Sequence, residues 1–185
     1  MKVGIIAGSI REGRNGIKVA EWVDEIAQKR GDADYELIDL KKFNVPLLTD
    51  PRHPAMAGGK YSTPEVQAWS AAIGSCDAFV FVTPEYNHSV PGAFKNAVDS
   101  LAVEWMGKPV GFVSYGSSSG VRAVEAWRLS LANFGMLDQR AAVELGLFTE
   151  FDDQGNFTPA ERRVDEVNAM LDSVVAATKM VEASK

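Results

Sequence analysis

The sequence has few of the residues from which cross-links and metal sites are built. Its 185 residues include one cysteine, Cys76, and two histidines, His53 and His88. A single cysteine excludes an internal disulfide and a cysteine-cluster metal site, and it is typical of a reducing compartment. We expect Cys76 to be a small buried side chain at the start of a strand. The histidines are far apart in the sequence, so we expect solvated loop residues and no bound metal.

Long apolar runs, internal repeats and blocks of like charge are also missing. No segment approaches the roughly 18 consecutive apolar residues of a membrane span. The first residues, MKVGIIAGSIREG, pass from a short apolar stretch straight into charge and glycine, so they predict a first strand and not a signal peptide. No signal marks a domain boundary. The sequence therefore predicts one domain over residues 1–185, located in the cytoplasm and with no membrane partner.

Positive charge is in deficit. The chain has 25 acidic and 19 basic residues, which gives a formal net charge of −6. A surface of that sign repels phosphates, which argues against nucleic acid as a partner. An anionic ligand would therefore need a locally built site.

The sequence does contain a regular alternation of short apolar runs and amphipathic segments. Runs of strand length are residues 3–7, 35–40, 78–82, 110–113 and 141–145. Apolar residues at helical spacing fall within 19–27, 66–73, 94–101, 121–134 and 164–175. Five strands alternating with five helices predict parallel strands with right-handed crossovers, and hence a three-layer, doubly wound α/β fold.

Punctuating residues predict where the helices begin and end. Pro91 is tolerated in a first helical turn, and the serines at 117–119 are candidate N-caps for the fourth helix, which Gly135 would end. The stretch 158–161, Thr-Pro-Ala-Glu, has the spacing of a capping box before the last helix. The proline-rich stretch 43–61 is longer than a usual connection, so it is a lid, an interface segment or a flexible loop.

Ligands of such sheets bind beyond the carboxyl ends of the strands, so the loops after the first, third and fourth strands are considered together. The first, Gly8–Gly16, offers amides at a helix N-terminus, a hydroxyl and two guanidinium groups, which suit a phosphate. A plain glycine-rich turn is the alternative. The Walker pattern lacks its Lys and Ser/Thr, and the dinucleotide pattern G-x-G-x-x-G is absent.

The second and third loops suit a flat ring. After the third strand, PEYNHSVP presents an acid, an aromatic ring and an amide between two prolines. After the fourth strand, SYGSSSG would let a planar ligand lie against the backbone. Each loop could also be a simple polar or capped turn. One phosphate loop and two ring loops at one sheet edge together favour a mononucleotide with a large ring, and FMN fits best.

Three motifs resemble a known family. G-S-x-R follows the first strand, P-E-Y-N-x-S-x-P-G-x-x-K-N-A-x-D the third, and S-Y-G-x-S-x-G-x-R-A the fourth. Over residues 3–145 they resemble the NAD(P)H-dependent FMN reductases of the flavodoxin-like fold, a group that includes quinone, azo-dye and chromate reductases. The resemblance implies the strand order 2-1-3-4-5 and an enzyme that takes a hydride from NADPH or NADH and reduces a small acceptor or free flavin.

The resemblance also implies the cofactor-binding residues. The phosphate would be held by Ser9 and Arg11, the ring by Pro84, Glu85, Tyr86 and Asn87, and the far edge of the ring by Tyr115, Gly116 and Ser117. Because the flavin itself carries the redox chemistry, no side chain is expected to be catalytic.

The first loop departs from the family in one respect. Many members continue G-S-x-R-x-x-S-x-N, whereas Arg14 and Gly16 stand here at the serine and asparagine positions. Arg14, Asn15 or the main-chain amides of Gly16 and Ile17 are the candidates to replace the missing contacts. The family commonly forms homodimers or homotetramers.

Two other functions are compatible with the pattern. A flavodoxin-type electron carrier would bind FMN without oxidising NAD(P)H directly, although typical flavodoxins are more acidic and use hydroxyl-rich phosphate loops. An interaction module could keep the fold without the flavin, because fold alone does not fix function.

Overall fold

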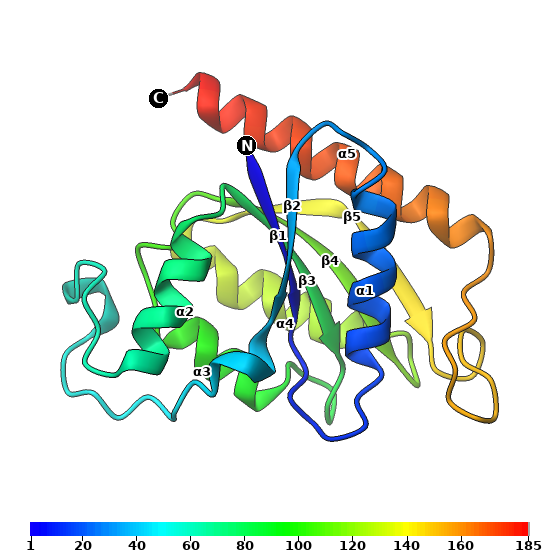
Figure 1. Ribbon diagram of the computed structural model, residues 1–185, viewed down its shortest axis with the longest axis horizontal. Coiled ribbons are helices and arrows are strands. Elements are labelled where there is room, and N and C mark those ends of the chain that lie inside the picture. Colours follow the sequence, from blue (N-terminus) through cyan, green and yellow to red (C-terminus); the bar gives the residue numbers. More distant parts are fainter. Residues whose placement is uncertain (185) are drawn as a thin grey trace.

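The computed structural model describes residues 1–184. Within them, five parallel strands form one sheet in the order β2-β1-β3-β4-β5, and helices cover both of its faces (Figure 1). This confirms the predicted fold class and strand order. The strands are β1 (Lys2–Ala7), β2 (Asp34–Asp39), β3 (Ala78–Pro84), β4 (Pro109–Gly116) and β5 (Leu137–Gly146). The helices are α1 (Gly16–Ala27), α2 (Pro64–Gly74), α3 (Gly92–Asp99), α4 (Val121–Leu131) and α5 (Arg162–Ala183).

The central strands are buried on both faces, because their side chains alternate between two cores. Val80 and Val82 of β3 belong to the core under α1 and α5. Phe79 and Phe81 point the other way, into the core under α2, α3 and α4. A continuous apolar run in the sequence therefore reflects a strand covered by helices on both sides.

Aromatic rings fill the second core. The ring of Phe81 lies 4.7 Å from that of Phe94, 5.2 Å from Trp127 and 5.8 Å from Trp105, measured between centroids. Trp105 and Trp127 are fully buried. These tryptophans are packing residues of the core. Cys76, just before β3, is also buried, and burial raises the pKa of its thiol.

Two predicted helix starts are wrong in detail, whereas the end of the fourth helix is close to the prediction. Pro91 is the N-cap of α3 and not part of its first turn. The helix α4 passes at Leu131 into a 3-10 turn, Ala132–Phe134, whose C-cap is Gly135 with φ 60°. The last helix begins at Arg162 without a capping box, because the main-chain NH groups of Thr158 and Ala160 both donate to Glu150 (2.8 Å each).

Two side chains hold the proline-rich stretch between β2 and α2 against the core. Asn96 of α3 accepts from the Leu48 amide (2.9 Å) and donates to the Pro46 carbonyl (2.8 Å). Further along, the Tyr61 hydroxyl donates to the buried carboxylate of Glu104 at 2.9 Å. This stretch is therefore anchored at both ends, and a cavity of about 270 Å³ lies beneath it.

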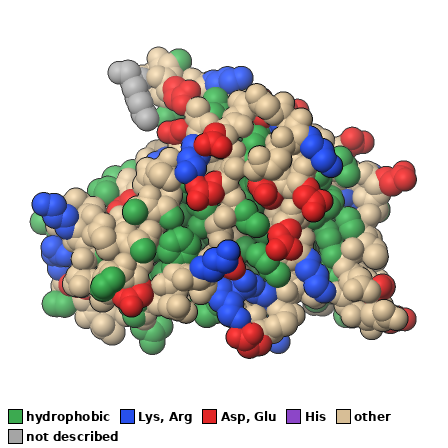
Figure 2. Space-filling model, viewed as in Figure 1, with side chains coloured by type: hydrophobic (Ala, Val, Ile, Leu, Met, Phe, Trp, Pro, Cys, Tyr) green, Lys and Arg blue, Asp and Glu red, His purple; other side chains and the backbone are tan. Residues whose placement is uncertain are grey.

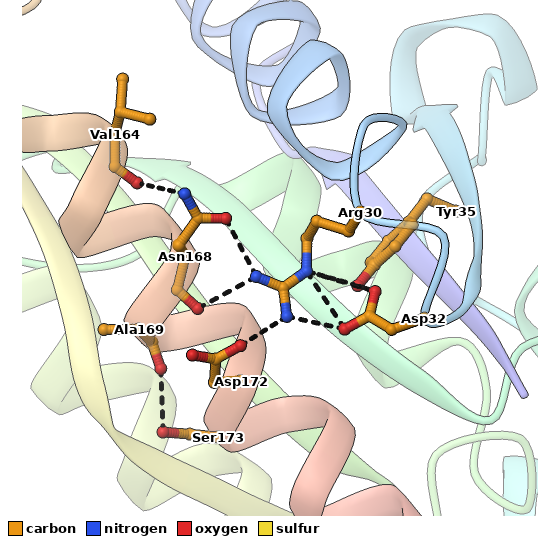
Figure 3. A network of polar contacts seen from close by, with 8 residues as sticks. All are labelled: Arg30, Asp32, Tyr35, Val164, Asn168, Ala169, Asp172 and Ser173. Carbon is orange, nitrogen blue, oxygen red and sulfur yellow. Dashed lines mark hydrogen bonds and ion pairs between the residues drawn. The ribbon is translucent and has the colours of Figure 1, made fainter.

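Arg30, in the turn after α1, connects the start of β2 to α5 (Figure 3). Its guanidinium donates to Asp32 (2.6 Å), Asp172 (2.5 Å) and the Asn168 side chain (2.9 Å). Tyr35 donates to Asp32 at 2.7 Å, and burial together with this bond raises the pKa of Tyr35 to about 12. The network lies at the amino ends of the strands, so it stabilises the fold far from the predicted ligand loops.

None of the helices in residues 1–184 combines the length and hydrophobicity needed to cross a membrane.

Replacing Arg30 should therefore reduce stability. We expect Arg30→Ala to lower the free energy of unfolding by about 1.5–3 kcal/mol, because several charge-assisted hydrogen bonds are lost. The control is Arg162→Ala, whose side chain is 65% exposed and pairs with Glu166, and which should change stability by less than about 0.5 kcal/mol. Urea unfolding measures both values. Equal losses in the two variants would contradict this role of Arg30.

Candidate functional site

The candidate site lies at the carboxyl ends of the strands, where the loops after β1, β3 and β4 meet. The hydroxyls of Ser9 and Tyr86 are hydrogen-bonded at 2.8 Å, although 77 residues separate them in the sequence. The guanidinium of Arg11 lies 5.7 Å from the centre of the Tyr86 ring, within cation–π range. The first and second predicted loops are therefore in direct contact. They meet beside β1, which has β2 on one side and β3 on the other.

The second loop is a tight turn that holds Tyr86 in place. Tyr86 and Ser89 exchange two main-chain hydrogen bonds of 3.0 Å. Between them, Asn87 and His88 have φ angles of 48° and 66°, the combination of a type I′ turn. Asparagine tolerates this left-handed conformation well, whereas histidine does so at some cost. Asn87 and His88 are exposed at the tip of the turn.

The side chain of Glu85 joins the second loop to the third. Its carboxylate accepts from the Arg122 main-chain NH (3.1 Å) and from the Arg122 guanidinium (2.6 Å). Glu85 therefore caps the N-terminus of α4. The prediction that serines 117–119 do so is wrong, because the N-cap residue is Gly120, which has no side chain to accept a hydrogen bond. This carboxylate, which the sequence suggested for a ring, is 6% exposed and is engaged with Arg122.

Tyr115, near the end of β4, is a buried residue of the candidate site. It is 6% exposed, and burial, followed by the nearby Tyr86 hydroxyl, raises the pKa of its phenol. A hydrogen bond with Ser9 and the charges of Arg14 and Arg11 act in the opposite direction. The phenol of Tyr115 is therefore neutral at physiological pH and belongs to the same cluster as Ser9 and Tyr86.

Two glycines make this arrangement possible. A Cβ atom on Gly16 would lie 2.4 Å from the Tyr115 hydroxyl oxygen. A Cβ atom on Gly8 would lie 2.0 Å from the Phe94 ring, which is itself wedged between Phe81 and Trp127. The first loop can follow this path only without side chains at positions 8 and 16.

The N-terminus of α1 points its unpaired amides at the first loop. Asn15 is the N-cap, but its side chain makes no capping hydrogen bond, so the NH groups of Gly16 and Ile17 have no side-chain acceptor within residues 1–184. Helix amides of this kind bind anions.

Gly116 and Ser117 lie at the start of the third loop, and Ser117 is exposed.

Sequence reasoning missed one ion pair at this edge. The Arg14 guanidinium donates to the carboxylate of Asp39, the last residue of β2, at 2.7 Å, and the two side chains are 10% and 8% exposed. Nearby, Lys41 pairs with Glu12 at 2.6 Å. Figure 2 shows Lys and Arg side chains gathered at the lower edge of the molecule, where the carboxyl ends of β1 and β2 lie in Figure 1. An acid at the end of the second strand was the available signal.

Comparisons of the chain with known proteins concern its family and its fold. A profile of the family described as NADPH-dependent FMN reductase matches residues 1–150. An NAD(P)H-dependent FMN reductase from Nectria sp. is 40% identical over 126 residues, which are 66% of this chain and 63% of that protein. The chain thus spans less than two thirds of the length of this relative. A quinone reductase from Pseudomonas putida is 31% identical over 171 residues and 86% of each chain.

A solved structure shares the fold. The flavoenzyme NAD(P)H:(acceptor) oxidoreductase FerB from Paracoccus denitrificans has a TM-score of 0.72 at 22% identity, and the match covers 95% of this chain and 98% of that one. At this level of identity the similarity concerns the fold alone.

Substitution of Gly8 tests the close approach of the first loop to α3. We expect Gly8→Ala to lower the free energy of unfolding by about 1–3 kcal/mol, because the added methyl group overpacks a rigid aromatic core. The control is Gly92→Ala, since a Cβ atom there meets nothing within 4 Å. It should change stability by less than about 1 kcal/mol. Urea unfolding of both proteins is the measurement, and an unaffected Gly8→Ala protein would argue against this packing.

Proposed function

Because the chain belongs to the NADPH-dependent FMN reductase family, we propose that it is an FMN-dependent oxidoreductase that takes a hydride from NADPH or NADH. Its acceptor is a quinone-like, azo or other small molecule, or free flavin. The observation that carries the proposal is the contact between the first and second loops, where Ser9 meets Tyr86 and Arg11 covers the same ring.

The residues at this edge fit FMN on three counts. The N-terminal amides of α1 at Gly16 and Ile17 have no side-chain acceptor within residues 1–184, and helix amides of this kind bind anions. Arg11 is exposed and forms no ion pair among residues 1–184, so its charge is available to a phosphate. The buried Nη1 atom of Arg14 lacks a hydrogen-bond acceptor there, which is unusual for a guanidinium and suits an anionic group.

Each loop has a defined task in this proposal. Ser9, Arg11, Asn15 and the amides of Gly16 and Ile17 hold the phosphate. Bound FMN would supply the hydride and electron-transfer chemistry, as flavins do in other proteins. The remaining residues orient the ring: Pro84, Glu85, Tyr86 and Asn87 on one side, and Tyr115, Gly116 and Ser117 at the far edge. Glu85 acts through its ion pair with Arg122, which fixes the second loop against the third.

The proposal extends to the protein as a whole. We place it in the cytoplasm as one FMN-binding domain over residues 1–185, without nucleic-acid or membrane partners. A homodimer or homotetramer is supported by large apolar side chains that are highly exposed in the single chain. These are Leu47, Met56, Leu129 and Phe148, each more than 75% exposed.

The direct test is spectroscopic. Protein incubated with FMN and then separated from unbound flavin should keep a flavin absorption band that NADPH bleaches under anaerobic conditions, and it should oxidise NADPH steadily once a soluble quinone is added. A protein that binds FMN but leaves NADPH unoxidised would be a carrier of the flavodoxin type. A protein that does neither would have to be an interaction module, and the proposal would fail.

Arg11 provides a quantitative test of the phosphate contact. Arg11→Ala should weaken FMN binding by about 1.5–3 kcal/mol, which is roughly 10- to 150-fold in Kd, because a charge-assisted contact is lost. Lys42→Ala is the control, since Lys42 is an exposed cation on the segment that follows β2. It should change Kd by less than about threefold. Titration of flavin fluorescence gives both constants, and unchanged affinity of the Arg11 variant would remove this residue from the site.

A further inference from the structure

Building on the proposed function, we infer that Arg14 is a phosphate-binding residue and that Asp39 is the residue that positions it. Arg14 stands at the serine position of the usual family pattern, and together with Asp39 it makes the site select FMN over flavin without a phosphate.

Asp39 is fixed from two directions. It is the last residue of β2 and pairs in register with Ala7, the last residue of β1, directly before the first loop. One carboxylate oxygen accepts from the Lys41 amide at 3.1 Å, and the other accepts from Arg14 Nη2 at 2.7 Å. With both oxygens engaged and the side chain 8% exposed, Asp39 holds the Arg14 guanidinium in one position.

The pairing leaves part of Arg14 unsatisfied. Its side chain is only 10% exposed, and Nη1 is buried without a hydrogen-bond acceptor in residues 1–184. A buried donor without a partner costs free energy, and such groups are rare in native proteins. Asp39 satisfies one end of the guanidinium, and the other end remains available for an acceptor that the protein itself does not provide. A phosphate oxygen is such an acceptor, and guanidinium groups bind phosphate with directional, charge-assisted bonds.

The charge of Arg14 acts on Tyr115, a buried residue of the candidate site. Together with the charge of Arg11 it lowers the pKa of the Tyr115 phenol, against the larger effect of burial. Tyr115 in turn contacts Ser9, the predicted phosphate residue. Arg14 is therefore close to the first loop's ligand-binding atoms as well as to β2.

A purely structural role makes different predictions. If Arg14 and Asp39 only fasten the first loop to β2, their loss should weaken FMN and riboflavin equally, because the loop as a whole would loosen. If Arg14 binds phosphate, riboflavin should be nearly unaffected, since it lacks that group. Charge alone predicts the opposite effect for Asp39, because removing an acid beside an anion site should strengthen FMN binding.

The experiment is to measure the Kd of FMN and of riboflavin for the wild type and for Arg14→Ala, Arg14→Lys and Asp39→Asn. We expect Arg14→Ala to weaken FMN binding by about 10- to 100-fold and riboflavin binding by less than about threefold. Asp39→Asn should also weaken FMN binding selectively. Arg14→Lys should restore part of the selectivity, because it keeps the charge but not the two-ended geometry.

Arg30→Ala is the matched control, because Arg30 is a similarly buried, carboxylate-paired arginine at the opposite end of the sheet. It should lose stability and keep the ratio of the two Kd values. Equal losses for both flavins, or tighter FMN binding by Asp39→Asn, would overturn the inference. If Arg14→Ala fails to fold, Asp39→Asn and Arg14→Lys still decide. Wild-type protein that binds no FMN would overturn the proposed function as well, whereas normal wild-type binding with unchanged selectivity in the variants would reject the inference alone.

Discussion

The hydrogen bond between Ser9 and Tyr86 joins two loops that the chain forms far apart, and the site depends on that junction. It requires β1 and β3 to be neighbours in the sheet, so that their carboxyl ends bring the loops to the same place. It also requires the first loop to lie flat on α3, which only glycine at position 8 allows. The apolar sheet and its aromatic core thus fix the position of a small polar cluster.

A second junction extends the site across the sheet. Glu85 follows β3 directly and binds the first turn of α4, so it holds the loops after β3 and β4 together. The type I′ turn at 86–89 then presents Tyr86 from this rigid base. Each of the three loops could alone be a simple turn, but together they form a preorganised surface. Tight binding of a flat ligand requires such a surface. The chemistry would come from the cofactor, and the protein would contribute position and charge.

The sequence predicts the fold well because its signals are local. Apolar runs such as 78–82 and helical stripes such as 94–101 each fall within a few residues, and their alternation specifies a parallel sheet. What the sequence does not predict about the site involves partners that are distant in the chain. Serines beside α4 look like caps, but Glu85, 37 residues from its partner Arg122, does the capping. The Arg14–Asp39 pair spans 25 residues and becomes visible only when β1 and β2 lie side by side. Local patterns cannot report such tertiary pairs.

The central claim is that these three loops form one ligand site, and hydrogen–deuterium exchange of the protein with and without FMN tests it most directly. The account predicts that FMN slows exchange at main-chain amides in three separate segments, residues 8–17, 85–90 and 116–122, with little change at the Arg30 network. Slower exchange in only one of these segments, or around the cavity beneath residues 46–66 instead, would contradict it.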